Sequence, residues 1–97
     1  MINLHFHPEV ELEIQESYSW YEAQAENLGD DFVSDLENAY QAILELPVVW
    51  PVFKGNFRRY ILARFPFSVI YRQSADAIFV VAVMHHSRKP NYWRKRA

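Results

Sequence analysis

The chain contains no cysteine, and this absence excludes a large class of sites. Without thiols, its 97 residues can form neither a disulfide nor a thiolate-bound metal centre. No apolar run approaches the roughly 20 residues of a membrane span. The first residues show neither the basic nor the apolar stretch of a signal peptide. We therefore expect a cytoplasmic protein with no membrane partner.

Basic residues are missing from the whole first half of the chain. Residues 1–46 contain no Lys or Arg, whereas eleven of the twelve acidic residues lie there. Residues 47–97 contain all ten basic residues, and their only acidic residue is Asp76. The halves carry net charges of −11 and +9, which sum to the net charge of −2. This asymmetry predicts either a basic surface for an acidic partner or two halves that neutralise each other within the fold.

The composition is that of a folded domain. Half of the residues are hydrophobic (51%) and 16% are aromatic, which is enough for a core and argues against disorder. The length suits a single domain spanning residues 1–97.

The first half changes from an alternating pattern to helical periodicity. Residues 2–6 alternate between apolar and polar side chains, which predicts a short half-buried strand. Pro8 suits the first turn of a helix, where its missing N–H costs nothing. We expect this helix to end at Gly29 with a positive φ angle, and Asp30 or Asp31 to cap a second amphipathic helix. Two helices joined by so short a turn form an antiparallel hairpin.

The second half is predicted to form strands. Residues 48–56 are expected to be a linker, and residues 57–64 a strand. Residues 67–72 and 78–84 complete an antiparallel meander. The uniform apolarity of residues 78–84 predicts a strand that is central in the sheet or covered on both faces. The order β-α-α-β-β-β predicts an α+β fold: an N-terminal strand, an antiparallel helical hairpin packed on an antiparallel β-sheet, and a short basic C-terminal tail.

Two stretches of the second half carry a specific pattern. Residues 57–72 (FRRYILARFPFSVIYR) resemble the arginine-rich strand, Phe-Pro-aromatic turn and Ile-Tyr-Arg strand of toxins of the RelE/ParE superfamily. Residues 82–93 (AVMHHSRKPNYW) resemble their last strand and its His-x-x-Arg-x-Pro-x-x-Trp ending. The N-terminal strand and acidic hairpin agree in order and length, so the resemblance covers nearly the whole chain. It implies the toxin of a type II toxin–antitoxin (plasmid-stabilisation) system, neutralised by a small cognate antitoxin.

The resemblance implies one of two activities. RelE-type members enter the ribosomal A site and cut mRNA, whereas ParE-type members inhibit DNA gyrase. RelE-type members tend to carry an arginine where this chain has Ser68, and the ending with Pro90 and Trp93 resembles the ParE-like branch. We therefore favour a gyrase inhibitor. Ribosome-dependent mRNA cleavage is the alternative, and a non-toxic or attenuated binding module is a further one. We expect no cofactor and no bound metal.

The candidate site residues lie in the second half. For RNA cleavage the candidates are Arg64, Arg88 and Tyr92, because the reaction needs cations for the phosphorane charge and a group that transfers protons. Arg88 is the favoured functional residue. The set considered for target or antitoxin binding comprises Arg58, Arg59, Arg64, Arg72, Arg88, Lys89, Tyr92 and Trp93.

Each candidate also has a structural interpretation. Arg58 and Arg64 could form ion pairs with the acidic hairpin, and Tyr92 and Trp93 could pack the tail against the sheet. The adjacent residues His85 and His86 are expected to point to opposite faces of a strand, so they cannot easily share a metal.

Overall fold

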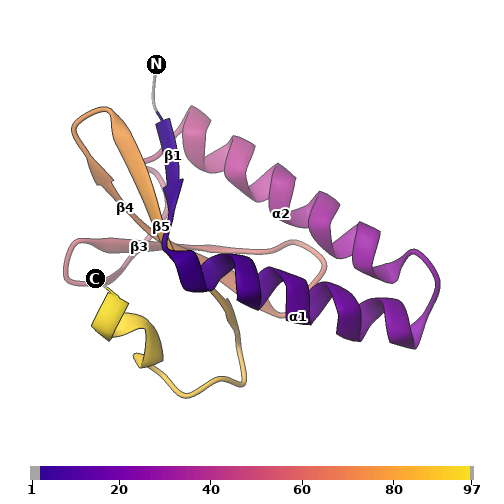
Figure 1. Ribbon diagram of the computed structural model, residues 1–97. Helices are drawn as coiled ribbons and strands as arrows, with labels where there is room; N and C mark the ends of the chain where they lie inside the picture. The colour runs from indigo at the N-terminus through magenta and orange to yellow at the C-terminus, as the bar shows by residue number, and fades with distance from the viewer. Residues whose placement is uncertain (1–2, 97) are drawn as a thin grey trace.

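Five strands and a helical hairpin make up most of the chain (Figure 1). The computed structural model describes residues 3–96, so Ile2, the first residue of the predicted N-terminal strand, lies outside the described part. Within this part, no helix combines the length and apolarity needed to span a membrane. The elements are β1 (Asn3–Phe6), α1 (Pro8–Gln24), α2 (Leu28–Glu45), β2 (Val52–Lys54), β3 (Phe57–Ile61), β4 (Phe67–Ser74), β5 (Ala77–His85) and the 3-10 helix η1 (Tyr92–Arg96).

The strands form one sheet in the order β1-β5-β4-β3-β2. The predicted meander of β3, β4 and β5 is confirmed, and so is the α+β class. β5 lies between two strands and is covered on both faces, which explains its continuous apolar sequence. The sheet is mixed and not wholly antiparallel, because β1 pairs parallel to β5 whereas the other strand pairs are antiparallel.

Two predictions about the strands were wrong. The expected linker 48–56 contains β2, which pairs with β3 at the edge of the sheet. The strand predicted for residues 57–64 ends at Ile61, because the chain turns inward there and buries Leu62 and Phe65 in the core. The backbone N–H of Arg64 donates to the Asp35 carboxylate (2.9 Å) instead of to a neighbouring strand.

The turn between the helices also differs from the prediction. The positive φ angle (68°) belongs to Asn27, which is also the residue preceding α2. Gly29 lies in the first turn of α2, where a Cβ would come within 2.8 Å of the Tyr18 carbonyl oxygen. Its missing side chain therefore permits the close approach of the two helices. Asp30 and Asp31 lie in the first turn of α2, where the helix dipole favours them, and do not cap it.

The sheet is packed on both faces. The helical hairpin covers one face, and the second face carries a smaller cluster around Trp93 of η1, which is only 1% exposed. Phe53 and Phe57 pack against the Trp93 ring, at centroid distances of 6.2 and 5.0 Å. The C-terminal segment is therefore a packed part of the fold, as the structural interpretation of Trp93 predicts.

Candidate functional site

The last part of β5 has an open edge. β1 ends at Phe6, which pairs with Val80, and the chain then enters α1. β5 continues to His85, and within residues 3–96 no strand lies beside this continuation on the β1 side. A β-bulge at Val81 shifts the register against β4. After the bulge, Val81 and Val83 therefore direct backbone groups toward the side that β1 has left.

Glu13 and Arg96 take the place of the missing strand. The Glu13 carboxylate accepts the backbone N–H of Val83 (3.0 Å), and Arg96 donates to the Val81 carbonyl (3.2 Å). Glu13 and Arg96 also form an ion pair of 3.1 Å, with side chains only 10% and 14% exposed. The second carboxylate oxygen of Glu13 accepts the hydroxyl of Tyr92. One carboxylate of α1 thus joins β5 to the C-terminal helix.

Two arginines contact the ring of Tyr92. The guanidinium carbon of Arg88 lies 4.0 Å from the ring centroid and that of Arg96 lies 5.0 Å from it, which are cation–π distances. Burial, together with the hydrogen bond to Glu13, raises the pKa of Tyr92 well above its ordinary value. The hydroxyl therefore stays protonated at neutral pH and donates to the carboxylate.

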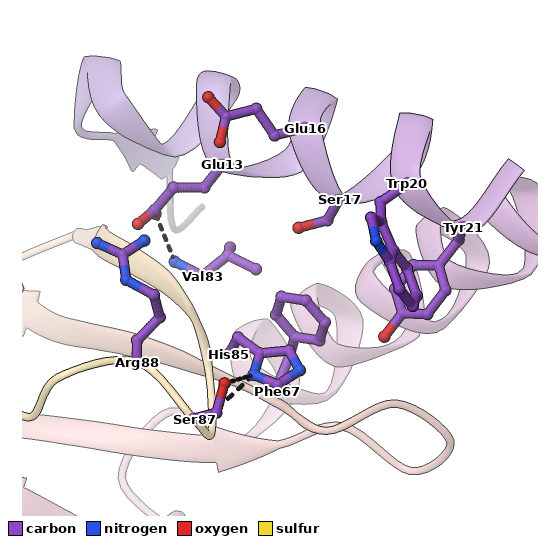
Figure 2. Close-up of a pocket in the computed structure, with 10 residues that line it drawn as sticks. All are labelled: Glu13, Glu16, Ser17, Trp20, Tyr21, Phe67, Val83, His85, Ser87 and Arg88. Carbon is purple, nitrogen blue, oxygen red and sulfur yellow. Dashed lines mark hydrogen bonds between the residues drawn. The ribbon is translucent and has the colours of Figure 1, made fainter. Parts of the chain in front are cut away.

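A pocket of about 300 Å³ opens beside this cluster, between α1 and the end of β5 (Figure 2). Trp20 and Tyr21 of α1 form one wall, and Phe67 lies opposite them beside the ring of His85, at a centroid distance of 4.9 Å. Trp20 is 60% exposed, which is unusual for so large an apolar side chain. The pocket is lined by Glu13, Glu16, Ser17, Trp20, Tyr21, Phe67, Val83, His85, Ser87 and Arg88.

The two histidines have separate partners. In His85, Nδ1 accepts the backbone N–H of Ser87 (3.0 Å) and lies 2.7 Å from the Ser87 hydroxyl oxygen. In His86, Nε2 lies 2.9 Å from the hydroxyl oxygen of Ser68, which is fully buried. The two imidazoles therefore share no partner, as predicted, although β5 ends at His85 and His86 belongs to the turn after it.

The structure brings only part of the candidate set together. Arg88 and Tyr92 meet at the cluster, and the exposed Lys89 lies next to them in the chain. The other arginines are spread over the sheet and its loops and have structural partners. Arg58 donates to the Trp50 carbonyl (2.7 Å), Arg59 stacks on Phe53 (4.6 Å), Arg64 pairs with Asp31 (3.5 Å) and Arg72 stacks on Phe79 (5.1 Å).

Glu13, Arg96 and Trp20 were not among the predicted site residues. One signal for Glu13 was present: it follows the buried Val10 by three residues, and residues at that spacing are neighbours on a helix surface. No comparable signal indicated Arg96, because its partners lie far away in the chain.

Comparison with known proteins identifies a family and a similar fold. A family model described as the ParE toxin of the type II toxin–antitoxin system, parDE, matches residues 4–90. A chain of the chromosomal ParDE TA system from P. aeruginosa matches with a TM-score of 0.70 and 18% sequence identity, covering 88% of this chain and 96% of that chain. At this identity, the structural match shows a common fold. The comparison with curated protein sequences found no match.

Proposed function

Because the chain belongs to the ParE toxin family of type II toxin–antitoxin systems, we propose that it arrests growth by inhibiting DNA gyrase. The family match makes the chain a toxin component of the ParE-like type. A cognate antitoxin is the partner that such a system implies. Gyrase is the target implied by the resemblance of the C-terminal ending to the ParE-like branch.

The environment of Tyr92 is the observation that favours gyrase inhibition over mRNA cleavage as the activity. A residue that transfers protons works best with a pKa near the working pH. The pKa of Tyr92 is raised by burial and by its hydrogen bond to Glu13, so its hydroxyl is a poor base at neutral pH. Ser68 adds to this, because it is buried against His86 where RelE-type members tend to carry a cation.

Unpaired positive charge supports a binding surface near the C-terminus. Among residues 3–96 the ion pairs are Arg64–Asp31 and Arg96–Glu13, so the acidic half neutralises only part of the basic half. Four exposed basic residues close to the pocket and η1 form no ion pair in this part of the chain, which favours a partner with acidic groups. They are Arg88, Lys89, Arg94 and Lys95.

A DNA supercoiling assay with purified gyrase tests the target. The protein is expected to inhibit supercoiling, and Arg88→Ala to raise the concentration needed by about tenfold, because exposed arginines are frequent binding hot spots. Lys54→Ala is the matched control, since it removes one positive charge from β2, the edge strand opposite β1. Unchanged supercoiling at micromolar excess of the protein would exclude gyrase as its target.

Two further experiments address the alternatives. Primer extension on translated mRNA would reveal cuts at the ribosomal A site if the protein were a ribosome-dependent nuclease, and we expect none. Induction of the protein is expected to arrest growth, and co-expression of the small neighbouring gene to relieve the arrest. Normal growth on induction of folded protein would instead favour a non-toxic binding module.

A further inference from the structure

The pocket exposes a piece of strand edge with unused hydrogen-bonding groups. Phe67 donates its N–H to the Phe65 carbonyl and accepts the N–H of Leu62, so both of its groups face away from β5. Its partner in the register is His85. In an antiparallel pair, hydrogen-bonded and non-bonded positions alternate. The backbone groups of His85 therefore face away from β4, as does the Val83 N–H that donates to Glu13.

Most of the groups on this edge are occupied. Arg96 binds the Val81 carbonyl, Glu13 binds the Val83 N–H, and the His85 carbonyl accepts the N–H of Arg88 (3.0 Å). Two groups remain without a partner in residues 3–96: the Val83 carbonyl and the His85 N–H. Both residues line the pocket (Figure 2). An acceptor followed by a donor two residues later is the pattern that another extended chain can pair with.

We propose that this edge binds an extended segment of the antitoxin, which lies beside residues 83–85 of β5, past the groups that Glu13 and Arg96 occupy. The inference rests on the proposed toxin–antitoxin function and adds the place and mode of binding. A segment parallel to β5 can use both free groups with a single residue, which donates to the Val83 carbonyl and accepts from the His85 N–H.

The side chains around the edge indicate which residue types the bound antitoxin segment carries. Trp20, Tyr21 and Phe67 provide an apolar surface, and the pocket volume of about 300 Å³ suits one large apolar side chain. Arg88 supplies a positive charge on one side, and Glu16 a negative charge on the other. The segment is therefore expected to carry a large apolar residue, with an acidic residue on the Arg88 side only.

Amide hydrogen exchange followed by NMR tests the edge directly. The probe is the product of the small neighbouring gene, added to the full-length protein. The His85 amide is expected to exchange rapidly in the free protein and at least about tenfold more slowly in the complex. The His86 amide is the internal control, because it already donates to the Pro66 carbonyl (2.9 Å) and is protected in both states.

A pair of variants gives an independent measurement. His85→Pro removes the free N–H and the imidazole, whereas His85→Ala removes only the imidazole. Proline is tolerated where a strand N–H faces away from its neighbour. We expect His85→Pro to bind the antitoxin about tenfold more weakly than His85→Ala, because the partner carbonyl is left unpaired.

The outcomes separate this inference from the proposed function. If a complex forms but exchange at His85 is unchanged, the edge proposal is wrong and the toxin–antitoxin assignment stands. If His85→Pro fails to fold, the exchange measurement on the unmodified protein still decides. If the neighbouring gene product neither binds nor relieves growth arrest, the proposed antitoxin partnership itself fails, and the edge proposal with it.

Discussion

At the scale of single residues, Glu13 is the position where one substitution affects three parts of the chain. Glu13→Ala removes the partner of the Arg96 guanidinium and of the Val83 N–H, both mostly buried. Breaking such a pair costs about 3 kcal/mol or more of the free energy of unfolding. Urea denaturation is expected to show this loss, and a smaller one for Glu13→Gln, which keeps an acceptor oxygen. The control Glu16→Ala should stay within about 0.5 kcal/mol of the unmodified protein; equal stability of Glu13→Ala and Glu16→Ala would contradict the role assigned to Glu13.

The hydroxyl of Tyr92 separates the two toxic activities. Tyr92→Phe removes the hydrogen bond to Glu13 but keeps the ring that Arg88 and Arg96 both contact. The proposed gyrase inhibition needs no proton transfer by the hydroxyl, so we expect the variant to arrest growth and to lose about 1 kcal/mol of stability. Growth curves after induction measure the first effect and thermal unfolding the second. A folded variant without toxicity would instead support mRNA cleavage with proton transfer by the Tyr92 hydroxyl.

At the scale of elements, the contact between α1 and α2 reverses an expectation based on helix propensity. Replacing a glycine inside a helix with alanine normally stabilises the helix, by about 1 kcal/mol. At Gly29 the new Cβ would lie 2.8 Å from the Tyr18 carbonyl oxygen and 2.7 Å from Cγ of Glu22. We expect Gly29→Ala to destabilise the fold by about 1–3 kcal/mol, as overpacking does. Asn38→Ala, at an exposed position of α2, serves as the control, and higher stability of Gly29→Ala would show that the helices can separate at little cost.

At the scale of the whole molecule, buried tyrosines predict sensitivity to alkaline pH. Burial raises the pKa of Tyr71 to about 12, and it raises the pKa values of Tyr40 and Tyr92 further. An unfolded tyrosine loses its proton near pH 10. Because the folded state holds these protons more tightly, their stabilising contribution is complete below about pH 10 and declines as the pH rises through the folded pKa values. Chemical denaturation from pH 8 to 12 should show the decline, and Tyr71→Phe should make it shallower; a flat profile would contradict the burial of these hydroxyls.

The division of charge between the halves predicts the salt dependence of antitoxin binding. Arg88, Lys89, Arg94 and Lys95 are exposed without ion pairs in the described chain, so they can attract an acidic antitoxin. Raising the salt concentration from 0.05 to 0.5 M is expected to weaken binding by about tenfold, because salt screens exposed charges. Titration calorimetry at both concentrations measures this change. The double variant Arg88→Ala, Lys89→Ala should depend less on salt, and affinity independent of salt would exclude the electrostatic contribution.

Much of the fold follows from the sequence because its signals are local. Apolar periodicity predicted the helical hairpin, and short apolar runs predicted β3, β4 and β5. The ending from His85 to Trp93 indicated the toxin family that the comparison then showed. Two local signals were misread. Asn27 and not Gly29 takes the left-handed turn, and β2 lies within a stretch that resembles a loop, because pairing with β3 outweighs its weak strand pattern.

The site depended on tertiary structure. Tyr92 and Glu13 lie 79 residues apart, and no local pattern indicates that a carboxylate of α1 will bind the hydroxyl of η1. Their meeting requires β1 to end at Phe6, β5 to continue beyond it, and a bulge at Val81 to turn the backbone groups toward α1. The sequence by itself therefore determined the helical hairpin, four of the five strands, the division of charge and the family. Only the tertiary structure decided which edge stays open and which side chains fill it, because strand lengths and register are set by pairings between distant segments.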